Sequence, residues 1–244
     1  MSHARRLGIL GGTFDPIHVG HLDAADAARA ALSLDEILLV PALDPPHRPI
    51  DPRATMYQRF ALVSLAAADR PVYRVSDMEL LRQGPSYTAD TLRSLHAQGW
   101  RASQLFFILG TDAFAEIATW HDYPSILDLA HFVVIARPGT TIDMAVARTP
   151  ELRARMCIGE AQGDMGEAQG DIVPRNTAID EQSTRIFLVE ADTRDVSSTQ
   201  VRERLAAAQP IDDLVPAAVA RHILKHHLYG AVDDLHGEDE RSRN

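Results

Sequence analysis

Residues 7–21 read LGILGGTFDPIHVGH, and this stretch predicts more of the structure than any other part of the chain. Its apolar start, residues 7–10, has the length and branched composition of a buried strand, and a helical pattern begins near Val19. Gly11 and Gly12 lie between them, and glycine permits a tight turn and close approach of backbone N–H groups to an anion. A strand, a glycine turn and a helix start in this order indicate a phosphate-binding loop.

Two histidines stand at the start of the expected helix. His18 and His21 are three residues apart, so their side chains face the same way. Imidazole donates hydrogen bonds and can carry positive charge near neutral pH, which suits the charge that develops on phosphate oxygens during group transfer. A lone histidine is more often structural than catalytic, but this pair follows a glycine turn, so both are candidate catalytic residues.

Outward from this loop, short apolar runs alternate with helical patterns. Strands are expected at 7–10, 36–40, 72–75, 105–109, 132–136 and 186–189. Helices are expected at 19–32, 56–68, 88–98, 123–130, 198–208 and 215–227. This alternation predicts an α/β fold, a Rossmann-like parallel sheet flanked by helices, with ligands bound outside the carboxyl ends of the strands.

The helix expected at 56–68 has the clearest start, because Thr55 and Gln58 have the spacing of a capping box. We expect one apolar face to pack on the sheet, formed by Met56, Phe60, Val63 and Ala67.

We expect residues 1–230 to form a single domain. Residues 159–165 and 166–172 repeat the pattern GEAQGD, which is polar and glycine-rich and predicts a flexible loop over 158–173. The polar residues 231–244 predict a disordered tail.

Composition excludes several classes of protein. The formal net charge of -10 argues against a nucleic-acid binder, which needs a basic surface. No apolar stretch is long enough to span a membrane, and no secretory signal pattern opens the chain. The single cysteine, Cys157, fits a reducing cytoplasm, and no Cys/His spacing predicts a metal site. The P-loop and G-x-G-x-x-G patterns are also absent, which disfavours P-loop hydrolases and dinucleotide oxidoreductases.

A second loop, residues 196–202, follows the last strand and opens a helix. Ser197 and Gln200 have capping-box spacing, and Ser198 and Thr199 offer hydroxyl donors. A well-capped helix explains these residues, but it does not explain Arg202, whose planar guanidinium suits bidentate phosphate binding.

Residues 11–21 resemble the first motif of the nucleotidylyltransferase superfamily, with its His-x-Gly-His element, and residues 196–202 resemble its second. The resemblance implies an adenylyltransferase that uses Mg²⁺ carried with ATP, and we name no protein ligand for the metal. It implies catalytic roles for His18, His21 and Arg202. It places ATP against Gly11, Gly12, Thr13, Phe14, His18, His21, Gly110, Asp112, Ser197, Ser198, Thr199 and Arg202.

Further segments resemble the nicotinate-mononucleotide adenylyltransferase branch of that superfamily. They imply an acceptor site formed by Arg48, Ser86, Tyr87, Thr88, Trp120 and Arg137. Each segment alone has an ordinary explanation: a proline-rich connector, helix caps at 86–88 and at Asp112, a core tryptophan and a strand-end turn. The branch usually has lysine where this chain has Arg48, which keeps the charge but changes the geometry.

The implied reaction transfers the adenylyl group of ATP to nicotinate mononucleotide. A phosphate monoester has a second pKa near 6, so this acceptor is already ionised at neutral pH and needs no protein base. Alternatives are a nicotinamide-mononucleotide or phosphopantetheine adenylyltransferase, or a non-catalytic nucleotide-binding module. The expected partners are small molecules rather than nucleic acid or membrane, and a homo-oligomer is compatible with the sequence.

Overall fold

The computed structural model of the chain describes residues 5–46, 52–136, 146–159 and 183–231. Arg48, Arg137, most of the GEAQGD repeat and residues 232–244 lie outside the described residues. The loop and tail predicted over those segments therefore stay predictions.

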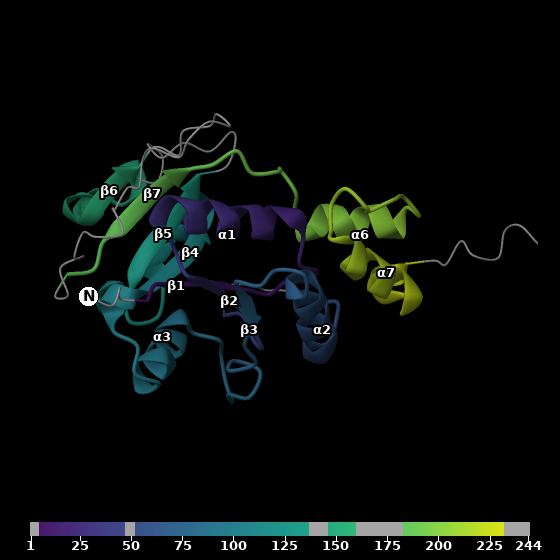
Figure 1. Cartoon of the computed structure of the whole chain (residues 1–244), viewed down its shortest axis with the longest axis horizontal. Helices are drawn as coiled ribbons and strands as arrows, with labels where there is room; N and C mark the ends of the chain where they lie inside the picture. Colours follow the sequence, from purple (N-terminus) through teal and green to yellow (C-terminus); the bar gives the residue numbers. More distant parts are fainter. Residues whose placement is uncertain (1–4, 47–51, 137–145, 160–182, 232–244) are drawn as a thin grey trace, which may run out of the picture.

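A parallel sheet forms the centre of the described structure (Figure 1). Its seven strands are β1 (Leu7–Gly12), β2 (Glu36–Pro41), β3 (Tyr73–Val75), β4 (Leu105–Gly110), β5 (His131–Ala136), β6 (Met156–Gly159) and β7 (Ile186–Glu190). The order is β3-β2-β1-β4-β5-β7-β6, and every neighbouring pair is parallel. The predicted α/β class and all six predicted strands are confirmed. The edge strand β6 was not predicted. It includes residues 158 and 159, so the flexible loop expected over 158–173 is wrong at these two positions.

The described α-helices include α1 (Val19–Leu32), α2 (Met56–Ala67), α3 (Thr88–Ala97), α4 (Thr111–Ala115), α6 (Ser198–Ala206) and α7 (Ala217–Lys225). Short 3-10 helices are η1 (Ala102–Gln104), η2 (Ile117–Thr119), η3 (Ser125–Asp128), η4 (Pro150–Arg155) and η5 (Leu228–Gly230). Five predicted helices are confirmed. The helix expected at 123–130 is wrong, because only the 3-10 turn η3 forms there, after Pro124. The five-residue α4 was not predicted.

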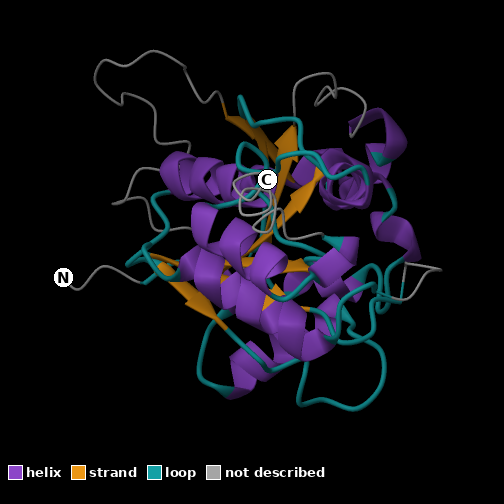
Figure 2. Ribbon diagram, turned by 90° about the vertical axis from the view of Figure 1, so that its right-hand side faces the viewer, coloured by secondary structure: helices purple, strands orange, loops and turns teal. Residues whose placement is uncertain are grey.

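Helices cover both faces of the sheet. On one face, residues from α1, α2, α6 and α7 join the strands in one buried apolar cluster, and on the other face α3 and α4 contribute to a second cluster. Figure 2 shows the strands between and behind these helices. Along β4, Phe106 and Ile108 belong to the first cluster and Phe107 and Leu109 to the second. Burial on both faces explains the unbroken apolar runs that predicted the strands.

The strand order changes direction between β1 and β4. The chain continues from β1 to β2 and β3 on one side, and from β4 to the remaining strands on the other. The loops that leave β1 and β4 therefore diverge to opposite sides and leave a crevice at the carboxyl ends of the two strands. This crevice is where a ligand is expected.

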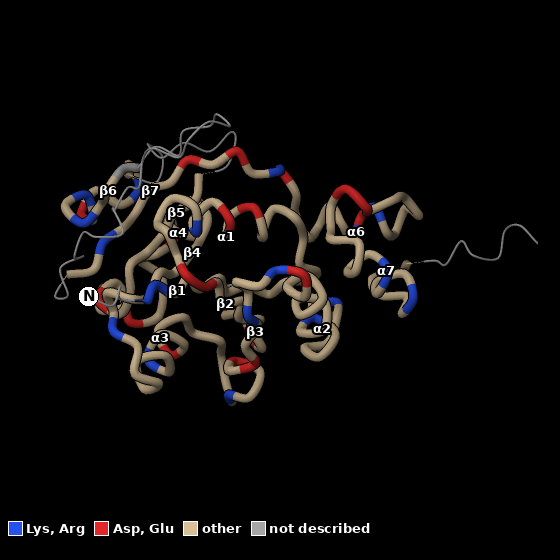
Figure 3. Tube along the Cα trace, in the orientation of Figure 1, with Lys and Arg blue, Asp and Glu red and all other residues tan. Residues whose placement is uncertain are grey.

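In the part of the chain that is described, acidic and basic residues are interspersed along the trace (Figure 3). Among the helices of that part, none is long and apolar enough to cross a bilayer.

Candidate active site

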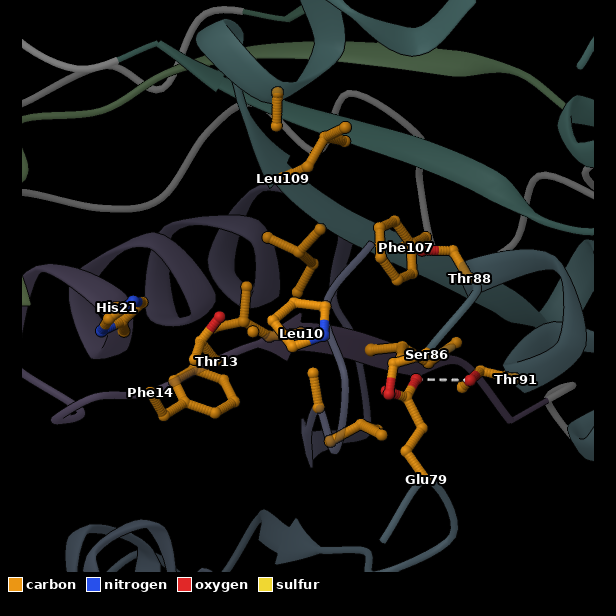
Figure 4. Close-up of a pocket in the computed structure, with 18 of the residues that line it drawn as sticks. Leu10, Thr13, Phe14, His21, Glu79, Ser86, Thr88, Thr91, Phe107 and Leu109 are labelled. Carbon is orange, nitrogen blue, oxygen red and sulfur yellow. Dashed lines mark hydrogen bonds between the residues drawn. The ribbon is translucent and has the colours of Figure 1, made fainter. Parts of the chain in front are cut away.

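A cavity of about 320 Å³ lies at the carboxyl ends of β1 and β4 (Figure 4). Gly11 and Gly12 line it from β1, Phe107 and Gly110 from β4, and Thr88 from the start of α3. The two glycines still belong to β1 and pair with Val40 and Pro41 in the next strand, so the tight turn expected at the glycines is wrong. The left-handed residue is Phe14, with φ of 49°. The glycines line the cavity, and a Cβ on Gly12 would lie 3.1 Å from the Phe14 ring.

The two histidines are brought together as their spacing predicts. His18 is the N-cap of α1, and its backbone N–H donates to Nδ1 of His21 at 3.2 Å. The ring centroids lie 3.7 Å apart. Because Nδ1 of His21 accepts this bond, the neutral ring carries its proton on Nε2 and can donate from there. His21 lines the cavity, whereas His18, which was expected to contact ATP, is buried and is not among the lining residues.

The surroundings of Gly20 explain why the His-x-Gly-His element has a glycine at this position. A Cβ at this position would lie 3.1 Å from the carbonyl oxygen of Arg194 and 3.2 Å from Nδ1 of His18. Arg194 is itself fixed, because its guanidinium pairs with both carboxylate oxygens of Asp23 at 2.8 and 2.7 Å. A side chain at this position would therefore press on the Arg194 carbonyl and the His18 ring unless they shift by a few tenths of an ångström.

The second motif meets the first across the loop after β1. Ser197 caps α6 by accepting from the N–H of Gln200 at 3.1 Å, as predicted. The Ser198 hydroxyl donates to the carbonyl of Pro16 at 2.8 Å and lines the main cavity. Arg202 donates to the carbonyl of Asp15 at 2.6 Å. Arg202 and Thr199 line a second cavity of about 610 Å³ rather than the main one.

Asp15 connects these segments, although the sequence analysis gave it no separate role. Its carboxylate is buried and accepts from the backbone N–H groups of Arg53 and Ala54 at 2.8 and 3.0 Å. It also lies 3.9 Å from the Arg202 guanidinium. Burial and the adjacent Asp15 carboxylate raise the pKa of Tyr229. The carboxylate thus joins the first motif to α2, α6 and the end of the described chain.

Arg59 is a further buried residue of the site for which no role was predicted. This side chain is 1% exposed and donates to the carbonyls of Thr13 and Ala42 at 2.7 and 2.6 Å, so it ties the loops after β1 and β2 together. Burial lowers the pKa of the guanidinium, although the nearby Asp15 carboxylate opposes the shift.

A signal for Arg59 was present in the sequence. The residue stands three positions after Met56 and four before Val63, on the face that was predicted to be apolar. Thr55 and Gln58 do form the predicted capping box. On the predicted face, Val63 and Ala67 are buried, whereas Met56 and Phe60 are only half-buried.

The expected acceptor residues that are described gather at the opposite wall. Ser86, Thr88 and Trp120 line the main cavity. The edge of Trp120 meets Phe107 with ring centroids 6.0 Å apart. Tyr87 stacks on His121 at 4.2 Å, beside a small space shared with Thr88 and Trp120.

Two predicted ATP contacts differ in their surroundings. Gly110 lines the cavity as expected. Asp112 does not line it: this residue is exposed in the first turn of α4, and Ala113 of the same helix lines the cavity instead. Within the described ranges, no three His, Cys, Asp or Glu side chains are grouped so that they could hold a metal.

Fold and site define a class of protein. The model of the cytidylyltransferase-like family matches residues 9–204, so the chain belongs to that family of nucleotidyltransferases.

Curated relatives narrow this class. The chain is 39% identical over 224 residues to a probable nicotinate-nucleotide adenylyltransferase of Trichlorobacter lovleyi, covering 92% of this chain and 99% of the relative. It is 40% identical to a protein of the same name from Roseiflexus sp., covering 91% and 97%. Within its family the chain thus belongs with the nicotinate-nucleotide adenylyltransferases.

A solved structure supports the fold. The Plasmodium falciparum nicotinic acid mononucleotide adenylyltransferase complexed with NaAD superimposes with a TM-score of 0.66 at 17% identity. The match covers 92% of this chain and 97% of that one.

Proposed function

We propose that the chain transfers the adenylyl group of ATP to nicotinate mononucleotide, giving nicotinate adenine dinucleotide (deamido-NAD) and pyrophosphate, a step of NAD biosynthesis. The observation that carries this proposal is that one cavity is lined by both nucleotide motifs and by the acceptor segments. Gly11, His21 and Ser198 stand in its wall, and so do Thr88 and Trp120.

In the nucleotide half, hydrogen-bond donors at the start of α1 face the phosphates. His21 donates from Nε2, and His18 and the helix N-terminus add to the positive potential there. The extended glycines of β1 leave room for phosphate oxygens beside the backbone. Arg202 stabilises the triphosphate end from the second cavity, where Arg53 is a further cation.

The chemical step needs alignment more than proton transfer. An acceptor phosphate oxygen forms a bond to the α-phosphorus, and the bond from that phosphorus to the bridging oxygen of pyrophosphate breaks. The acceptor is already ionised, so the two histidines stabilise charge and neither acts as a base. Mg²⁺ carried with ATP neutralises phosphate charge. No covalent enzyme intermediate forms.

In the acceptor half, aromatic and polar groups suit a pyridine carboxylate. Trp120 offers a ring for stacking, which contributes about 1 kcal/mol beyond burial. The Thr88 hydroxyl and the backbone N–H groups at the start of the ten-residue helix α3 can receive the carboxylate. Contacts from Arg48 and Arg137 to the acceptor remain predictions, as do a cytoplasmic location and a homo-oligomer.

An acceptor panel tests the proposal. With ATP and Mg²⁺, kcat/KM for nicotinate mononucleotide should exceed that for nicotinamide mononucleotide and for phosphopantetheine by at least about tenfold, because a charge-assisted hydrogen bond contributes roughly 1.5–3 kcal/mol. If kcat/KM for either competitor equals or exceeds that for nicotinate mononucleotide, the proposed acceptor is wrong. Tight ATP binding without turnover of any acceptor would favour a nucleotide-binding module instead.

A further inference from the structure

Glu79 is a buried carboxylate in the wall of the main cavity that the proposed reaction does not use. It lies in the loop between β3 and α3 and is 6% exposed. In Figure 4 its carboxylate points toward Ser86 and Thr91, and a dashed line marks the bond from Thr91. A buried carboxylate is costly unless donors surround it, so its partners need to be identified.

The hydroxyl of Thr91 has a defined direction. Its oxygen accepts from Nη2 of Arg82 at 2.8 Å. Its proton has two acceptors in reach, and the Glu79 carboxylate is charged and closer than the Tyr87 carbonyl at 3.4 Å. Arg82 also places its charge 4.0 Å from that carboxylate. Thr91 is 1% exposed in the first turns of α3, so this bond fixes Glu79 to the helix.

The hydroxyl of Ser86 is directed in the same way. Its oxygen accepts from the backbone N–H groups of Leu43 and Asp44 at 2.9 and 3.2 Å. Both lone pairs are then occupied, and the single proton is left to donate to Glu79. The Ser86 hydroxyl therefore accepts hydrogen bonds from the loop after β2 and donates one to the Glu79 carboxylate.

These bonds make one connected path. The path runs from the backbone of Leu43 and Asp44 through Ser86 and Glu79 to Thr91. Burial raises the pKa of Glu79, while the hydrogen bonds from Thr91 and Ser86 and the charge of Arg82 oppose that shift. Both loops joined by the path form walls of the cavity where the acceptor segments lie.

We propose that Glu79 is a positioning residue for the acceptor: through Ser86 and Thr91, its carboxylate sets the loop after β2 at a fixed distance from the start of α3. This inference rests on the proposed function, because the affected substrate is nicotinate mononucleotide. Glu79 acts through its two hydroxyl partners, so its loss should disturb acceptor binding and leave the ATP half unchanged.

Steady-state kinetics of the full chain with ATP, Mg²⁺ and nicotinate mononucleotide test the proposal. Glu79→Gln replaces one carboxylate oxygen by an amide N–H₂, which cannot accept from a hydroxyl, and it removes the negative charge that Thr91, Ser86 and Arg82 stabilise. The KM for the acceptor should rise about tenfold, with the KM for ATP within about twofold of wild type. Asp77→Asn makes the same chemical change at an exposed position of the same loop and should leave both KM values unchanged.

A second pair of variants covers the case in which Glu79→Gln does not fold. Thr91→Val removes the hydroxyl at nearly constant volume, and Thr91→Ser keeps it. We expect the first to raise the KM for the acceptor and the second to retain the wild-type value, a difference that packing alone would not produce.

Three results would overturn the assignment. One is an unchanged KM for the acceptor in Glu79→Gln and Thr91→Val, and another is an equal rise in the KM values of both substrates. The third is a lower KM for the acceptor, which would mean that the carboxylate only repels it. If wild-type protein makes no product from nicotinate mononucleotide, the proposed function fails instead, and the two failures are distinguishable.

Discussion

Single charged side chains hold the loops of this site in place. Asp15, Arg59 and Glu79 are all buried. Asp15 and Arg59 bond to backbone groups 39 and 46 residues away in sequence, and Glu79 bonds to hydroxyls at and just before the start of α3. The loops after parallel strands have no neighbouring strand to satisfy their backbone groups, so side chains must do so. Residues that contact no substrate can therefore control the geometry of those that do.

Arg59→Met should strongly destabilise the fold. The carbonyls of Thr13 and Ala42 would lose a charged donor while they stay buried, and the Asp15 charge would lose a compensating cation. We expect the free energy of unfolding in urea to fall by about 3 kcal/mol. The matched control is Arg93→Met, which removes ion pairs from a half-exposed side chain and should cost less than about 1 kcal/mol. Equal effects of the two variants would contradict the role of Arg59.

His18→Ala should lower kcat by about 10²- to 10³-fold, because charge stabilisation at the transferring phosphate is lost. The KM for ATP should change much less. Since His18 is also an N-cap, His18→Asn serves as a control that keeps a good capping residue without the imidazole. Similar losses of kcat in both variants would support a catalytic imidazole. Near-normal turnover in His18→Asn would show that His18 acts only as a helix cap and has no catalytic role.

At the scale of elements, α1 is placed by its contacts with the second motif. Its first turn carries the histidines, the Arg194 carbonyl passes over Gly20, and Ser198 bonds back to the loop before the helix. The start of α1 and the start of α6 thus form one structural unit, and changes at their contact should affect catalysis.

Gly20→Ala tests this contact. A helical glycine replaced by alanine usually gains up to about 1 kcal/mol of stability. Here the new methyl group would press on the Arg194 carbonyl and the His18 ring, at 3.1 and 3.2 Å. Displacement of the ring by a few tenths of an ångström should lower kcat about tenfold, measured in the pyrophosphate-release assay. Wild-type kcat together with a raised melting temperature would show that the contact is slack.

Most helices and strands could be predicted from the sequence, but only part of the candidate active site could be. Apolar runs and the caps at Thr55 and Ser197 are local signals, and they predicted most strands and helices. Buried charges are different, because Arg59 is buried only through partners 17 and 46 residues away in sequence. A single sequence does not show such pairings, so the place of Arg59 on the apolar face could suggest burial but could not identify the carbonyls that its guanidinium contacts.

At the scale of the whole molecule, a sheet buried on both faces also encloses a histidine. His131 of β5 packs against Phe106 and Phe187, with ring centroids 4.8 and 5.5 Å away. Its Nδ1 accepts from the backbone N–H of Arg185 at 2.9 Å. Burial lowers the pKa of His131 from 6.5 to about 4. Protonation of His131 is therefore less favourable in the folded chain than in the unfolded chain, and it lowers the stability of the fold at acid pH.

The sign of the pH effect follows from proton uptake. Below pH 6.5 the unfolded chain protonates this residue, while the folded chain does so only near pH 4. The contribution of neutral His131 to stability is therefore present above pH 6.5 and is lost as the pH falls to 4. Between pH 7 and 4, wild type should lose about 3 kcal/mol more than His131→Asn in urea unfolding. His121→Gln, at a half-exposed position, should follow wild type, and parallel curves for wild type and His131→Asn would contradict the assignment.

The most direct test of adenylyl transfer follows label from ATP carrying ³²P at the α-phosphorus, in the presence of Mg²⁺ and nicotinate mononucleotide. We predict that the label enters nicotinate adenine dinucleotide and that unlabelled pyrophosphate is released in equal amount. Label appearing in AMP or ADP, without labelled dinucleotide, would contradict the proposed reaction.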